Sequence, residues 1–127
     1  MILNDTYTLS NGMKIPKLGL GTWEIPDDKA AQAVRNAVKL GYRHIDTAQG
    51  YDNEKGVGEG IRTCGVSREE LFVTTKLQAF YKTYKEAKEA IEDSLRISGL
   101  DYFDLMIIHA PQPWTDFHNG EHFFEGN

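Results

Sequence analysis

Apolar and polar residues alternate along this chain with two different periods. Short apolar runs end on polar residues, as buried strands do, and between them apolar residues recur every three or four positions, as on one face of a helix. Asn11-Gly12, between two short alternating runs, predicts a leading hairpin over residues 7–16. The pattern then predicts strands at 18–21, 42–46, 71–76 and 103–109, and helices at 28–40, 53–64 and 84–98.

Residues with capping or helix-breaking character mark the helix ends. Asp27 is placed to cap the first helix, and Ser67 with Glu70 has the pattern of a capping box before the third strand. Gly99 is placed to end the third helix. Three glycines between residues 56 and 60 lower the helix propensity of the second helix, which we therefore expect to be weak.

Strands that alternate with helices favour a parallel sheet joined by right-handed crossovers. The last three predicted strands end at residues 46, 76 and 109, so that successive strand ends lie 30 and 33 residues apart. This spacing is close to the roughly 31 residues per unit of a TIM (β/α)8 barrel. A doubly wound sheet has similar spacing, so the period alone leaves both α/β folds open. On the barrel interpretation, the hairpin, four strands and three helices make residues 1–127 the N-terminal part of a single, incomplete barrel domain.

Composition excludes several classes of partner. The 127 residues carry a net charge of −5, which disfavours nonspecific binding to nucleic acid. No apolar run approaches the roughly 18 residues of a membrane helix, and the N-terminus lacks the pattern of a signal peptide. Cys64 is the only cysteine, which fits a reducing compartment. We therefore expect a cytoplasmic protein that binds neither nucleic acid nor membrane.

Three predicted strands end on residues that can carry charge. These are Asp46, Lys76 and His109, and Tyr51 follows Asp46 by five residues. Parallel strands bring their carboxyl ends to one edge of a sheet, where α/β proteins keep their chemistry. We therefore expect all four side chains to meet there, with the tips of Tyr51 and Lys76 within about 4 Å. Taken singly, each polar residue also fits a strand that simply leaves the core for water.

Together, these four residue types suit the reduction of a carbonyl group. Hydride transfer to a carbonyl carbon leaves an alkoxide that needs a proton, and a free tyrosine, with a pKa near ~10, gives up its proton reluctantly at neutral pH. A lysine ammonium beside a tyrosine lowers the tyrosine's pKa, and an aspartate keeps that lysine charged and oriented. A histidine can hold the carbonyl oxygen in place for attack.

Several segments, in this order and at this spacing, are similar to one enzyme family. They are Gly19–Trp23, Gly41–Ala48, Tyr51, Asn53–Glu54, Gly56–Gly58, Arg68–Phe72, Thr75–Leu77, Gly99–Tyr102, Asp104–Leu105 and Ile108–His109. From about residue 6 onward the chain resembles the aldo-keto reductases, in particular bacterial members that reduce small aldehydes, ketones and sugar-derived carbonyls. The resemblance implies a TIM barrel and an NADPH (NADP⁺)-dependent reduction of an aldehyde or ketone to an alcohol.

The resemblance also implies a role for each site residue. Tyr51 is the proton donor, Lys76 and Asp46 tune it, and His109 orients the substrate. The implied cofactor-binding residues are Gly21, Thr22, Trp23 and Asp46, and the implied substrate-binding residues are Trp23, Tyr51 and His109. The implied partner is a small carbonyl compound, and we expect a complete barrel of this kind to be a monomer or weak dimer.

The chain departs from the family at two positions and in extent. Gln78 and Ala110 stand where many members carry tryptophan or another large residue, so we expect a less aromatic pocket. In the family, most contacts to the NADPH phosphates, ribose and adenine come from the C-terminal half of the barrel. We therefore expect residues 1–127 alone to be inactive as a reductase and prone to self-association.

Two other interpretations of the chain remain open at the level of sequence, and a metal site is disfavoured. The barrel could serve as a non-catalytic binding or regulatory module, although such a role does not require Tyr51 and Lys76 together. The chain could also be an inert truncation product. His118 and His122 have a spacing that suits zinc on a helix, but Gly120 and the surrounding loop composition disfavour a helix, so we expect no metal site.

Overall fold

The structure, a computed structural model, describes residues 1–111. The aromatic residues from Trp114 onward and the pair His118 and His122 lie outside the described residues. The elements are η1 (Ile2–Asn4), β1 (Thr6–Thr8), β2 (Lys14–Pro16), β3 (Leu20–Gly21), α1 (Asp27–Lys39), β4 (His44–Asp46), η2 (Gln49–Tyr51), α2 (Glu54–Thr63), η3 (Arg68–Glu70), β5 (Phe72–Gln78), α3 (Tyr84–Ser98) and β6 (Leu105–His109).

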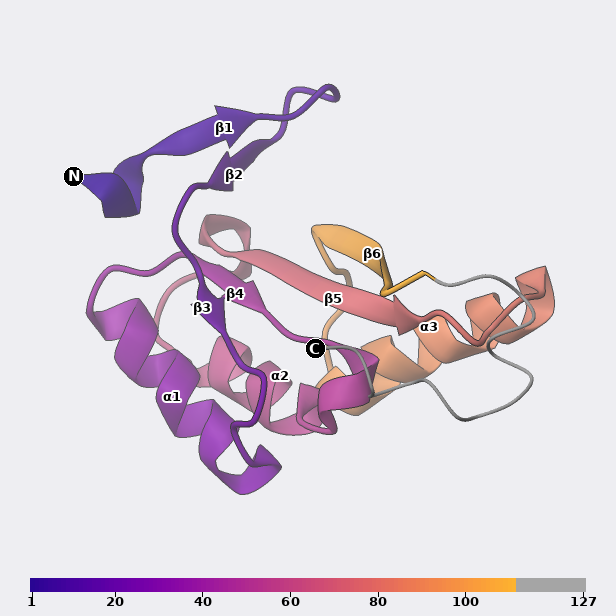
Figure 1. Cartoon of the computed structure of the whole chain (residues 1–127). Helices are drawn as coiled ribbons and strands as arrows, with labels where there is room; N and C mark the ends of the chain where they lie inside the picture. Colours follow the sequence, from indigo (N-terminus) through magenta and orange to yellow (C-terminus); the bar gives the residue numbers. More distant parts are fainter. Residues whose placement is uncertain (112–127) are drawn as a thin grey trace.

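A hairpin precedes a four-stranded parallel sheet, as the hydrophobic pattern predicts. Strands β1 and β2 pair antiparallel, and the sheet has the order β3-β4-β5-β6 with every neighbouring pair parallel. Figure 1 shows α1, α2 and α3 on one side of this sheet and the hairpin at the end where β3 begins. The strands lie in sequence order and their crossover helices cover one side only, as in a TIM barrel, whereas a doubly wound sheet has helices on both sides. The predicted fold class is therefore confirmed.

The two faces of the sheet have different roles because side chains alternate along each strand. Ile45 and Val73 are fully buried and pack with Val34, Val57 and Ile61 of the helices in one hydrophobic cluster. Burying an aliphatic side chain of this size contributes about 1.5–3 kcal/mol. Residues an odd number of positions from Ile45 or Val73 on the same strand, among them Asp46 and Lys76, therefore have their side chains on the other face of the sheet.

Helix α2 is continuous because its glycines allow close packing, which the sequence interpretation missed. A Cβ added at Gly58 would lie 2.0 Å from the carbonyl oxygen of Ser98, and one at Gly56 would lie 2.1 Å from that of Asp27. One at Gly60 would lie 2.7 Å from the Cβ of Val34. The glycines let α1 and the end of α3 approach the α2 backbone, and this packing offsets their low helix propensity.

Two details of the sequence prediction are wrong. Asp27 does not cap α1: Pro26 occupies the cap position, and Asp27 Oδ1 instead accepts a hydrogen bond of 2.7 Å from the backbone N–H of Gly56. The sheet strands also differ in length from the prediction. The first, second and fourth begin two residues late, because pairing starts only where the neighbouring strand lies alongside, and β5 continues to Gln78.

Other boundary predictions hold. Glu70 Oε2 accepts from the backbone N–H of Ser67 at 3.1 Å, which completes the predicted capping box. Gly99 ends α3 with a φ of 69°, in the left-handed region that favours glycine. Among residues 1–111, every helix is too short or too polar to cross a membrane.

Candidate active site

The four predicted side chains come from the carboxyl ends of adjacent strands. Asp46 is the last residue of β4, Lys76 lies near the end of β5, and His109 is the last residue of β6. Tyr51 ends the 3-10 helix η2, which follows β4 directly. Since β4, β5 and β6 are parallel neighbours, their ends meet at one edge of the sheet, as the sequence predicts.

The ammonium group of Lys76 is the centre of this arrangement. Its Nζ donates to Asp46 Oδ2 at 2.6 Å, to the backbone carbonyl of Thr47 at 2.9 Å and to the hydroxyl oxygen of Tyr51 at 3.3 Å. The tips of Tyr51 and Lys76 therefore lie within the predicted 4 Å. With all three ammonium hydrogens directed at oxygen atoms, the cation has a fixed place beside the phenol. A positive charge there stabilises a phenolate when the hydroxyl loses its proton.

His109 packs against the phenol ring of Tyr51. The rings of Tyr51 and His109 meet edge to face, with centroids 5.7 Å apart and an interplanar angle of 83°. Burial lowers the pKa of His109 from 6.5, the ammonium of Lys76 lowers it further, and the carboxylate of Asp46 partly opposes them. The lowered pKa favours the neutral imidazole at pH 7, and a neutral imidazole has one N–H that can donate to a ligand.

Of the predicted cofactor residues, Gly21 ends β3, Thr22 and Trp23 follow it, and Asp46 ends the neighbouring strand β4. Thr22 donates to the carbonyl oxygen of Asp46 from its backbone N–H at 3.0 Å and from its hydroxyl at 2.9 Å. Gly21 pairs with Asp46 in the sheet and has open space where a side chain would stand. The side chain of Trp23 is 67% exposed. An open backbone surface beside an exposed indole is therefore available at the edge that carries the four side chains.

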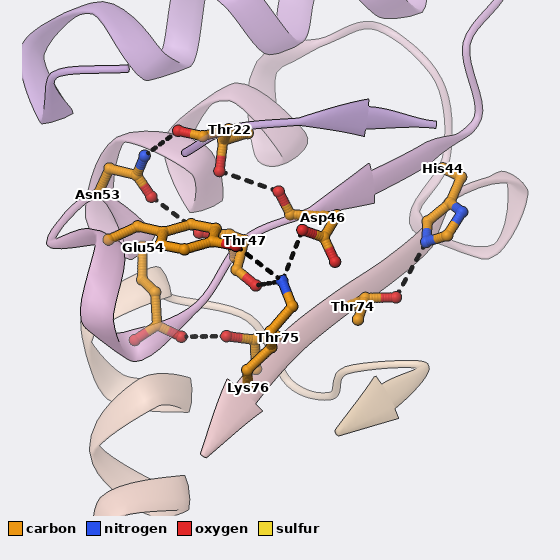
Figure 2. Close-up of polar contacts among 10 residues, drawn as sticks. Thr22, His44, Asp46, Thr47, Asn53, Glu54, Thr74, Thr75 and Lys76 are labelled. Atoms are coloured by element: carbon orange, nitrogen blue, oxygen red, sulfur yellow. Dashed lines mark hydrogen bonds and ion pairs between the residues drawn. The ribbon is translucent and has the colours of Figure 1, made fainter. Parts of the chain in front are cut away.

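Asn53 and Thr47 are buried polar residues to which the sequence analysis gave no role. Asn53 is fully buried, and Figure 2 shows it between Thr22 and Thr47. Its Oδ1 accepts from the hydroxyl of Thr47 at 2.8 Å, and its Nδ2 donates to the carbonyl oxygens of Thr22 and Ile25 at 2.7 and 3.0 Å. The sequence offers one signal for Asn53, which is a short polar residue at the start of a predicted helix.

Glu54 is the second buried polar residue at the start of α2. Its carboxylate accepts from the hydroxyl of Thr75 at 2.7 Å and from that of Ser94 at 3.1 Å, as Figure 2 shows for Thr75. Burial raises the pKa of Glu54, and the two hydrogen bonds oppose part of that rise. The carboxylate thereby joins α2 to β5 and α3 on the helix side of the sheet.

A parallel barrel sheet with a tyrosine, lysine, aspartate and histidine at the carboxyl ends of its strands defines a class of oxidoreductase. The sequence model of the Aldo/keto reductase family matches residues 17–126. The chain belongs to this family.

Individual relatives agree with this assignment. The chain is 50% identical over 108 residues to the 9,11-endoperoxide prostaglandin H2 reductase of Trypanosoma cruzi, covering 84% of this chain and 38% of that protein. It is 44% identical over 108 residues to the methylglyoxal reductase DkgA of Escherichia coli, covering 85% and 38%. The crystal structure of an aldo/keto reductase from Brucella melitensis is similar with a TM-score of 0.84 and 46% identity, covering 90% of this chain and 44% of that one. The chain thus spans less than half the length of these relatives.

Proposed function

We propose that a complete barrel containing this chain reduces an aldehyde or ketone to an alcohol with NADPH. The observation that carries the proposal is the placement of the Lys76 ammonium 3.3 Å from the hydroxyl of Tyr51 and 2.6 Å from the carboxylate of Asp46. This arrangement suits a phenol that gives a proton to a developing alkoxide. Family membership and relatives named as reductases support it.

The site residues can supply the proton that this reduction needs, and NADPH, when bound, would supply the hydride to the carbonyl carbon. As the carbon–oxygen π bond breaks, the hydroxyl of Tyr51 donates its proton to the oxygen, which gives the alcohol. Lys76, fixed by Asp46, stabilises the phenolate until water returns a proton to Tyr51. The N–H of neutral His109 donates a hydrogen bond to the carbonyl oxygen and holds it near Tyr51.

The residues after β3 fit the nicotinamide end of the cofactor. The open surface over Gly21 allows a flat ring to approach the backbone, and the exposed indole of Trp23 offers an apolar wall. Thr22 holds the same stretch to Asp46. We therefore assign Gly21, Thr22, Trp23 and Asp46 to NADPH, and Trp23, Tyr51 and His109 to a small carbonyl substrate.

The test is the substitution Tyr51→Phe in the complete barrel. Since the change removes the proton source and keeps the ring, we expect NADPH to bind as before and kcat to fall by about 10²–10⁴-fold. Tyr42→Phe, two residues before β4 begins, is the matched control and is expected to leave kcat unchanged. If Tyr51→Phe keeps more than about a tenth of the wild-type kcat, another group supplies the proton. A wild-type barrel that binds NADPH and reduces no carbonyl compound would favour the binding or regulatory module instead.

A further inference from the structure

The side chain of Asn53 holds two separate loops of the site. It is fully buried, and all of its hydrogen-bonding groups have partners. The Nδ2 group uses both hydrogens, on the carbonyl oxygens of Thr22 and Ile25, and Oδ1 accepts from the hydroxyl of Thr47. Asn53 therefore joins the loop that carries Trp23 to the segment that follows Asp46.

Thr47 transmits this contact to the ammonium group of Lys76. Its hydroxyl donates to Asn53 at 2.8 Å, its backbone N–H donates to the carbonyl oxygen of Thr74 at 2.9 Å, and its own carbonyl oxygen accepts from Lys76 Nζ at 2.9 Å. Thr47 is almost completely buried, so water does not substitute for these partners. The position of the Thr47 carbonyl oxygen therefore depends on the hydrogen bonds that Thr47 makes to Asn53 and to Thr74.

The second branch from Asn53 reaches Asp46. Asn53 holds the carbonyl group of Thr22, and Thr22 donates twice to the carbonyl oxygen of Asp46. Asp46 and Thr47 are the two acceptors that fix Lys76 beside Tyr51. Thr47 therefore contacts the amide of Asn53 directly, and Asp46 is connected to the same amide through Thr22.

We propose that Asn53 is a positioning residue for the proton-donating group, and that it acts on Lys76 through Thr47. This inference rests on the proposed carbonyl reduction. The arrangement requires a short side chain that donates two hydrogen bonds and accepts one. An aspartate has the same shape, but its ionised carboxylate has no donor and would face two carbonyl oxygens. Asparagine therefore satisfies all three contacts at this position, whereas aspartate does not.

The experiment compares Asn53→Ala, Thr47→Val and the double variant in the complete barrel. Thr47→Val keeps the backbone carbonyl and removes only the hydroxyl that Asn53 holds. A misplaced ammonium should lower kcat by about tenfold to a hundredfold in each single variant, change KM for the carbonyl much less, and shift the pH dependence of kcat. Since both changes break one link, the double variant should fall no further than Asn53→Ala.

Ser98→Ala is the matched control for a merely structural effect. Ser98 is also buried and hydrogen-bonded, but its partners are the carbonyl oxygen of Leu95 and the backbone N–H of Leu100, at the end of α3. We expect Ser98→Ala to lower the Tm while kcat and its pH dependence stay unchanged. If Asn53→Ala and Thr47→Val behave in the same way, or if their effects on kcat multiply in the double variant, the proposal is overturned.

Two further measurements keep the proposal testable. If Asn53→Ala does not fold, Thr47→Val alone tests the positioning role: a shifted pH dependence of kcat supports it, and an unchanged one overturns it. Crystal structures of the variants give a result that does not depend on turnover: a separation of Lys76 Nζ from the Thr47 carbonyl oxygen that grows from 2.9 Å beyond the hydrogen-bonding limit supports the positioning role, and an unchanged separation overturns it. The Tyr51→Phe result decides the proposed reduction separately.

Discussion

At the scale of single residues, the surroundings of His109 lower its pKa and so favour the neutral ring. Its burial and the Lys76 ammonium both lower its pKa from 6.5. We expect a ¹H–¹⁵N or ¹³C NMR titration of His109 to give a midpoint below 6.5, with the neutral ring present throughout the range above it. Because the folded-state pKa lies below the unfolded one, protonating His109 lowers the free energy of unfolding as the pH falls below about 6.5. A midpoint at or above 6.5 would mean that the ring is more exposed to water, or closer to Asp46, than the structure shows.

The sequence predicts some of these residues better than others, for a physical reason. Asp46, Lys76 and His109 are predictable because each ends an apolar run, and parallel strands must bring such ends together. Tyr51 lies in a 3-10 turn, where no periodicity points to it. Its short distance in sequence from Asp46 and the chemistry of a tyrosine beside a lysine suggested its role, which the family resemblance also implies.

Asn53 and Thr47 show the limit of the sequence at this scale. The amide of Asn53 contacts Thr22, 31 residues earlier in the chain. A polar residue in a loop looks the same in sequence whether it faces water or three hydrogen-bonding partners, so its role became visible only with its burial and contacts.

At the scale of elements, the packing of α2 against α3 depends on Gly58. Alanine has the higher helix propensity, by about 1 kcal/mol, but its Cβ would lie 2.0 Å from the carbonyl oxygen of Ser98. The helices must then separate, and overpacking of this kind costs about 1–3 kcal/mol. We therefore expect Gly58→Ala to lower the free energy of unfolding of the complete barrel, measured by urea denaturation. Lys55→Ala, at an exposed position of the same helix, serves as the control and should change it by less than about 0.5 kcal/mol. A Gly58→Ala barrel as stable as the wild type would show that α2 and α3 can move apart at little cost.

Helix ends were more predictable than strand ends. The predicted bounds of α3, 84–98, are confirmed, because local residues fix both ends: Thr83 and Glu86 form a capping box, and Gly99 adopts a positive φ. Strand bounds depend on where the neighbouring strand lies. Strand β3 pairs with β4 only at Leu20 and Gly21, and the sequence of residues 18–21 contains no signal for where this pairing begins.

At the scale of the whole molecule, the described sheet has two outer strands. Within residues 1–111, β3 and β6 each pair with a strand on one side only. On β6, the side chains of Ile107 and Ile108 are 40% and 59% exposed. Outer strands with apolar side chains and unpaired backbone groups favour pairing with another chain. In a closed barrel, both outer strands have neighbours.

The last prediction concerns residues 1–127 on their own. We expect this chain to self-associate and to show no NADPH-dependent reductase activity, although Tyr51, Lys76 and Asp46 are in place. A catalytic group accelerates a reaction only when the reacting partners are held beside it. The residues that we assign to NADPH here meet only its nicotinamide end, and the chain covers 44% of the related Brucella melitensis structure. The test measures the mass of the purified chain in solution by light scattering and titrates NADPH while following tryptophan fluorescence from Trp23 and Trp114. A monomer that binds NADPH at micromolar concentration and reduces an aldehyde would show that this half of the barrel holds the cofactor unaided, and the assignment of most cofactor contacts to residues outside this chain would then be wrong.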